Sequence, residues 1–133
     1  MTLRVALIQT RTPATQEAAL EHVAPLIRQA AADGAKLILT PEGVNLLEQR
    51  RERREQAVTD QEADAAVTGL RDLARELGVW LLIDSGGEIV AAYDKLHVFD
   101  VTLPDGESWK ESSVIRPGDG AVVARVRTAR TLE

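Results

Sequence analysis

Residues 37–43 read Leu37-Ile38-Leu39-Thr40-Pro41-Glu42-Gly43, an apolar run that a proline ends and a carboxylate follows. Three consecutive aliphatic side chains are typical of a short buried strand, and proline is tolerated where such a strand ends. We therefore predict a strand over residues 36–40, with Glu42 just beyond it. Because functional residues of layered folds gather where strands end and loops begin, Glu42 is a candidate site residue.

Strand and helix patterns alternate around this run. Residues 3–9 are nearly all apolar, which predicts a strand buried on both faces. Apolar residues then recur at helical spacing between a capping Thr15 and a terminating Gly34. A second helix is predicted to start at the capping-box pattern of residues 59–62 and to end at Gly78.

The remaining segments predict short strands and exposed connections. Residues 79–83 and 88–93 look like a hairpin joined by a glycine-containing turn. Residues 49–56 are highly charged and are interpreted as an exposed connection, either a solvated helix or a loop. A loop over residues 94–120 and a last strand over residues 121–126 complete the pattern. Alternating strands and helices argue for a layered α/β fold.

Composition bounds the function. The chain has 133 residues with 44% hydrophobic content, which is enough for one domain. A net charge of -5 leaves no basic face for nucleic acid, and no apolar run approaches the roughly 20 residues that cross a membrane. Without a visible secretory signal, we expect a cytoplasmic protein. With no cysteine and two histidines, neither a metal site nor a cofactor is expected.

This architecture is compatible with two kinds of site. A nucleotide site needs a glycine-rich turn after the first strand, and residues 10–14 contain no glycine. The other candidate is the set Glu42, Lys95 and Glu111. Taken singly, each is typical of a surface charge. However, Glu42 and Lys95 each follow an apolar segment, and a carboxylate and an ammonium at converging strand ends can act on a bound carbonyl.

Three blocks resemble the nitrilase, or carbon-nitrogen hydrolase, superfamily. They are residues 37–43, Tyr93-Asp94-Lys95-Leu96-His97-Val98-Phe99-Asp100-Val101 and Glu111-Ser112-Ser113-Val114-Ile115-Arg116-Pro117-Gly118-Asp119. The Lys-Leu-His-x-Phe-Asp-Val form most resembles the amidase branch, which includes deaminated-glutathione amidase and omega-amidase. The resemblance extends from about Leu3 to Ala124.

This resemblance implies an α-β-β-α fold and a site of glutamate, lysine and cysteine that hydrolyses small carboxylamides or nitriles. It implies that Glu42 is the general base, that Lys95 stabilises the tetrahedral intermediate, and that Glu111 positions the lysine and substrate. In such a site the thiolate attacks carbon, ammonia leaves, and water hydrolyses the thioester.

The chain departs from the family pattern in three ways. It contains no cysteine, so the implied nucleophile is absent. A connection and strand are missing between Ile83 and Asp84, which predicts an internal deletion at 83/84. Residues 125–133 no longer resemble the family and are expected to form a divergent, disordered tail. We therefore expect a partial domain over residues 1–124, an incomplete α-β-β-α sandwich with roughly one sheet and two helices.

These departures define two functional hypotheses. In the first, the chain is a truncated family member that is inactive alone and self-associates through an exposed sheet face. The deletion also bears on whether Lys95 can face Glu42, since removing one strand from a meander reverses the next. In the second hypothesis, the chain is a non-catalytic module that binds a small carboxylate or another protein. Whether the chain is an enzyme stays open at this point.

Overall fold

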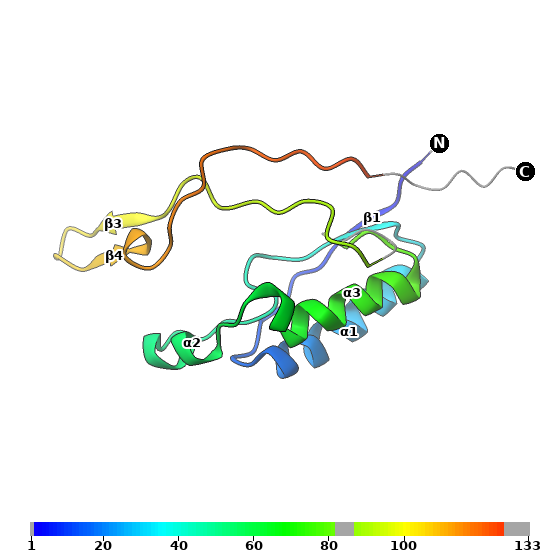
Figure 1. Cartoon of the computed structure of the whole chain (residues 1–133), viewed down its shortest axis with the longest axis horizontal. Coiled ribbons are helices and arrows are strands. Elements are labelled where there is room, and N and C mark those ends of the chain that lie inside the picture. Colours follow the sequence, from blue (N-terminus) through cyan, green and yellow to red (C-terminus); the bar gives the residue numbers. More distant parts are fainter. Residues whose placement is uncertain (1, 82–86, 127–133) are drawn as a thin grey trace, which may run out of the picture. The chain divides into compact units, whose positions relative to one another are not determined.

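The computed structural model describes residues 2–81 and 87–126, which belong to two compact units (Figure 1). The first unit comprises residues 1–90 with 126–133, and the second comprises residues 91–125. Two long helices and a parallel pair of strands form the first unit. An antiparallel hairpin forms the centre of the second.

A small parallel sheet organises the first unit. Strand β1 (Val5–Leu7) pairs with β2 (Leu37–Leu39), and Ala6 lies opposite Ile38. On the other side of β2, Ile38 N donates to Trp80 O at 2.8 Å and Trp80 N donates to Lys36 O at 2.9 Å. The strand predicted over 79–83 is thus a single parallel bridge at Trp80 within the described residues, and positions 82 and 83 lie outside them.

Helices α1 (Gln16–Ala32) and α3 (Ala65–Leu77) run side by side in Figure 1 and supply most of the core. Thr15 caps α1 by accepting a hydrogen bond from Ala18 N, and the chain leaves the helix through Gly34 at φ 86°. The two helices and the sheet share one cluster of buried side chains, which comprises Val23, Ile27, Ala35, Ile38, Leu70, Leu73, Ala74, Val79 and Leu81. Two helices on a small sheet are what the sequence predicts.

Strand β1 is covered on one face only, which corrects the prediction of burial on both. Ala6 and Ile8 pack against the core, whereas Leu7 is 78% exposed and Val5 is 44% exposed. The physical reason is that α1 and α3 lie on the same side of the sheet. Among the described residues of the first unit, no second layer covers the other side.

Helix α3 starts later than its capping-box pattern predicts. Residues 61–63 form a short 3-10 turn, η1 (Gln61–Ala63), and the cap is Asp64, whose carboxylate accepts a hydrogen bond from Val67 N at 2.9 Å. Thr59 instead accepts a hydrogen bond from the side chain of Gln16 at 3.0 Å. The end is as predicted, because Gly78 takes the left-handed conformation at φ 61°.

The charged segment 49–56 contains a helix, α2 (Arg51–Ala57), with no buried residue. It is therefore the solvated helix rather than the loop. Across residues 2–81 and 87–126, no helix is long and apolar enough to span a membrane.

The second unit contains a hairpin inside the segment predicted to be a loop. Strands β3 (Asp100–Thr102) and β4 (Ser108–Lys110) pair antiparallel, with Val101 opposite Trp109, and the turn η2 (Glu111–Ser113) follows directly. The turn between the strands holds Pro104-Asp105-Gly106, with Gly106 at φ 89°. A Pro-Asp-Gly run is a strong turn signal, so the sequence contained the information for this hairpin.

The strands predicted over residues 88–93 and 121–126 do not form. An extended segment becomes a strand only when a neighbour pairs with its backbone, and the described part of the chain supplies none for either segment. The turn at 84–86, the joint at 83/84 and the tail after residue 126 lie outside the described residues.

Candidate active site

Glu42 lies in a tight turn over residues 42–45 that follows β2 directly. Gly43 takes φ 69°, which glycine adopts without steric cost. Leu47 N donates to Pro13 O at 3.0 Å, which joins the segment after the turn to the connection between β1 and α1. The Glu42 side chain is exposed at this end of the sheet, where the sequence placed it.

A buried polar network holds the Glu42 turn in place. The side-chain amide of Asn45 donates to Asp64 Oδ2 at 2.8 Å, while the other oxygen of Asp64 caps α3. Asp64 is only 4% exposed. Beside it, Gln16 accepts from Ala65 N at 3.0 Å and donates to Ala57 O at 3.2 Å. One carboxylate thus links the turn that carries Glu42 to the start of a core helix.

Lys95 and Glu111 form the pair that the structure brings together in the second unit. Lys95 Nζ lies 2.9 Å from each oxygen of the Glu111 carboxylate. The Lys95 side chain is 37% exposed and that of Glu111 is 21% exposed. Glu111 can hold this position because it starts η2 directly after β4, so the hairpin fixes its backbone. Glu42 belongs to the first unit.

The Glu111 carboxylate is fixed by the backbone as well as by the lysine. It accepts a hydrogen bond from Phe99 N, and Glu111 N donates to Phe99 O at 3.1 Å. These contacts extend the hairpin by one residue pair beyond Asp100 and Lys110. The Phe99 amide first, and the Lys95 ammonium second, lower the pKa of Glu111 below its ordinary value. Glu111 is therefore an ionised, oriented anchor for the lysine.

Asp100 is a second fixed carboxylate near this pair. It accepts hydrogen bonds from Ser112 Oγ at 2.6 Å and from Ser112 N at 3.0 Å. Both bonds lower the pKa of Asp100, and the bond from the hydroxyl has the larger effect. Sequence reasoning gave Asp100 no role and did not single out Ser112, Asn45 or Asp64. The acidic residue just before the Ala66–Ala74 apolar pattern was the available signal for Asp64.

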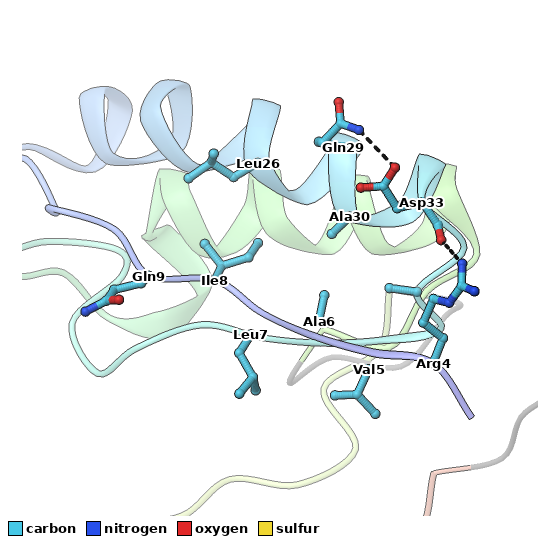
Figure 2. Close-up of a pocket in the computed structure, with 11 residues that line it drawn as sticks. Arg4, Val5, Ala6, Leu7, Ile8, Gln9, Leu26, Gln29, Ala30 and Asp33 are labelled. Carbon is cyan, nitrogen blue, oxygen red and sulfur yellow. Dashed lines mark hydrogen bonds between the residues drawn. The ribbon is translucent and has the colours of Figure 1, made fainter. Parts of the chain in front are cut away.

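A cavity of about 360 Å³ lies between β1 and α1 (Figure 2). Figure 2 shows the Gln29 amide directed to the Asp33 carboxylate, a 3.0 Å hydrogen bond, and the Arg4 guanidinium directed to the Asp33 carbonyl. Glu42, which is in the same unit, is not among the residues that line this cavity. Its lining comprises Arg4, Val5, Ala6, Leu7, Ile8, Gln9, Leu26, Gln29, Ala30, Asp33 and Ala35.

The chemistry available from these groups is that of acid-base and electrostatic catalysis. A carboxylate at the end of β2 can accept a proton, and an oriented ammonium can offset negative charge on an oxygen. No cluster of three or more histidines, aspartates or glutamates suited to a metal ion occurs among residues 2–81 and 87–126.

Fold and candidate site together define a layered α/β domain with a glutamate after a strand and a carboxylate-anchored lysine. Residues 4–83 match the model of the carbon-nitrogen hydrolase family. Deaminated glutathione amidase of Yersinia enterocolitica is 30% identical and its alignment covers 95% of this chain, while omega-amidase NIT2 of Homo sapiens is 27% identical with 87% covered. The chain belongs to the carbon-nitrogen hydrolase family.

Solved structures agree with this assignment. The C. elegans NitFhit protein has the same fold over 92% of this chain, with a TM-score of 0.78 and 20% identity. An amidase from Nesterenkonia sp. of the nitrilase superfamily gives a TM-score of 0.69 with 26% identity, covering 89% of this chain and 49% of the amidase chain. The chain spans about half the length of the curated relatives it matches.

Proposed function

We propose that this chain is the N-terminal part of a carbon-nitrogen hydrolase domain, that it keeps the glutamate and lysine of an amidase centre, and that it does not hydrolyse amides alone. The observation that carries the proposal is the Lys95–Glu111 pair, in which both carboxylate oxygens hold the ammonium, in a sequence without cysteine. A glutamate-to-glutamine variant of the Nesterenkonia amidase has been solved with acrylamide added at its active-site cysteine.

In the proposed centre, each retained residue has a chemical role. Glu42 is the general base that would take a thiol proton and later activate water. Lys95 offsets the negative charge that develops on the amide oxygen, and Glu111 orients Lys95. The compound class that such a centre would accept is small carboxylamides. The matched relatives are a deaminated glutathione amidase and an omega-amidase, and a related amidase variant was solved with acrylamide. Cytoplasmic location is part of the same proposal.

The lack of a nucleophile sets the expected rate. Covalent catalysis divides amide hydrolysis into two easier steps, and without the thiol neither Glu42 nor Lys95 can form the acyl intermediate. Positioned acid-base groups alone contribute about 10²–10⁴-fold, far below the acceleration that typical enzymes achieve. We expect no measurable turnover by the 133-residue chain.

An internal deletion at 83/84 is also proposed. The family model matches residues 4–83 and no further. The Yersinia alignment extends over 149 positions, more than the 133 residues of this chain, so it includes residues of the relative without a counterpart here. The second observation supports a domain that is shorter than that of the relative. The bounds 1–124 and the divergent tail over residues 125–133 are part of the same proposal.

Ammonia release from a panel of small carboxylamides tests the proposal, with the Yersinia amidase as positive control and Lys95→Ala as matched variant. We expect the wild-type chain and the variant to give the same background signal. Ammonia release by the wild-type chain that Lys95→Ala abolishes would overturn the proposed inactivity.

The second candidate function is a non-catalytic module that binds a small carboxylate. The exposed fraction of Lys95, 37%, supports it, because a partly solvated ammonium can still accept a second anion. Calorimetric titration with glutarate separates the two functions. Saturable binding that Lys95→Ala removes would favour the binding module, and no heat change would favour the inactive part of a hydrolase.

A further inference from the structure

The backbone of Lys95 is held by a second segment of the chain. Gly118 N donates a hydrogen bond to Lys95 O at 3.0 Å, within the run Arg116-Pro117-Gly118-Asp119. This contact acts at the root of the lysine side chain, whereas Glu111 acts at its tip. A long, flexible side chain is oriented only when both its root and its tip are fixed, since Lys has four rotatable bonds.

The contact depends on the absence of a side chain at Gly118. A Cβ atom there would lie 2.5 Å from Asp94 O, 2.8 Å from Asp94 Cβ and 3.0 Å from Asp94 C. These are backbone or near-backbone atoms, which cannot yield without moving the peptide that leads into Lys95. Gly118 is not among the positive-φ glycines, so glycine is required here because a side chain would clash and not because of the backbone conformation.

We propose that Gly118 is a positioning residue for Lys95: it lets two loop segments approach closely enough to fix the backbone from which the ammonium extends. Any side chain at this position displaces Asp94 and Lys95 together and separates the ammonium from Glu111. The catalytic meaning of this role rests on the proposed function, but the geometric role does not.

Gly120 provides a matched control two residues away. A Cβ there would meet nothing within 4 Å, and Gly120 also lacks a positive φ. Gly118→Ala and Gly120→Ala therefore make the same chemical change with the same loss of chain entropy in the unfolded state. They differ in the contact with Asp94.

Nuclear magnetic resonance of the full chain gives readouts for the pair and for the hairpin separately. The pair is followed by the contact between the Lys95 ammonium and the Glu111 carboxylate, and by the pKa of Glu111. The hairpin is followed by the cross-strand contact between Val101 and Trp109. A purely structural role for Gly118 would move both readouts.

In Gly118→Ala we expect the Lys95–Glu111 contact to be lost and the pKa of Glu111 to rise toward its ordinary value, while the Val101–Trp109 contact persists. Gly120→Ala should match the wild-type chain in all three. The proposal is overturned if Gly118→Ala retains the Lys95–Glu111 contact, or if it loses the Val101–Trp109 contact as well. It is also overturned if Gly120→Ala loses the Lys95–Glu111 contact as Gly118→Ala does. None of these readouts uses amidase activity, so this experiment can fail or succeed independently of the ammonia-release assay that tests the proposed function.

Discussion

The carboxylates of Asp100 and Glu111 make the second unit sensitive to acid. Each has a pKa below its ordinary value of 3.8 or 4.5, because Ser112 donates to Asp100 and because Phe99 and Lys95 donate to Glu111. A group whose pKa is lowered on folding stabilises the fold above its unfolded pKa, and this contribution is lost as pH falls through the folded value. The hairpin should therefore weaken below about pH 4.

Ser112→Ala tests the cause of the Asp100 shift. Removing the hydroxyl leaves only backbone donors, so the pKa of Asp100 should rise toward its ordinary value. Carboxylate chemical shifts measured between pH 2 and 7 report this directly, with the pH range set by the ordinary carboxyl pKa. Ser113→Ala is the control, because that hydroxyl donates to Lys110 O and not to Asp100. Equal shifts in both variants would contradict the assignment.

Single residues were predictable where they stand in blocks that resemble a known family. Glu42, Lys95 and Glu111 were named from such blocks, and the structure places the last two in contact. The role of Gly118 was not predictable, because it depends on a close approach between two loop segments that no local pattern encodes.

At the scale of the elements, the start of α3 links the stability of the fold to the turn that carries Glu42. Asp64→Ala removes the cap of α3 and leaves the Asn45 amide without its acceptor. Loss of a helix cap costs about 1 kcal/mol, and loss of the hydrogen bond between the half-buried Asn45 amide and a carboxylate adds about 1–3 kcal/mol. Denaturant unfolding should therefore show a free-energy loss of about 2–4 kcal/mol.

Asp60→Ala is the matched control for this prediction. Asp60 precedes η1, is exposed and makes no side-chain capping bond. Its removal should change the free energy of unfolding by less than about 0.5 kcal/mol, as is usual for surface substitutions. If Asp60→Ala lowered the free energy of unfolding as much as Asp64→Ala does, the assignment of Asp64 as the helix cap would be contradicted.

Helices were predicted better than strands for a physical reason. The α1 and α3 patterns, with Thr15 and Gly78 at their ends, are local, because helical hydrogen bonds join residues four apart. A strand exists only with a partner, and residues 88–93 and 121–126 have none among the described residues. The β3–β4 hairpin was missed although its Pro104-Asp105-Gly106 turn is a local signal.

At the scale of the molecule, we propose that the uncovered side of the sheet makes the chain self-associate. Within the described residues, β1 pairs only with β2. Leu7, the last residue of β1, is 78% exposed. An exposed apolar strand edge is a template for pairing with another chain, and a lysine there opposes such pairing. In size-exclusion chromatography we therefore expect the wild-type chain to elute as an oligomer and the Leu7→Lys variant to elute closer to the monomer.

Val58→Lys is the control for this substitution, because Val58 is 60% exposed but lies after α2 and not on the sheet. It should elute with the wild-type oligomer. A wild-type chain that remains monomeric at every concentration would contradict self-association, as would a Val58→Lys variant that dissociates as readily as Leu7→Lys.

The bond between Asn45 and Asp64 has an evolutionary consequence. Because Asp64 caps a core helix, selection for folding alone maintains it, and its partner Asn45 with it. The fold therefore holds the turn that carries Glu42 whether or not the chain catalyses a reaction. Persistence of this turn among relatives would therefore record a demand of folding and would not by itself identify a catalytic glutamate.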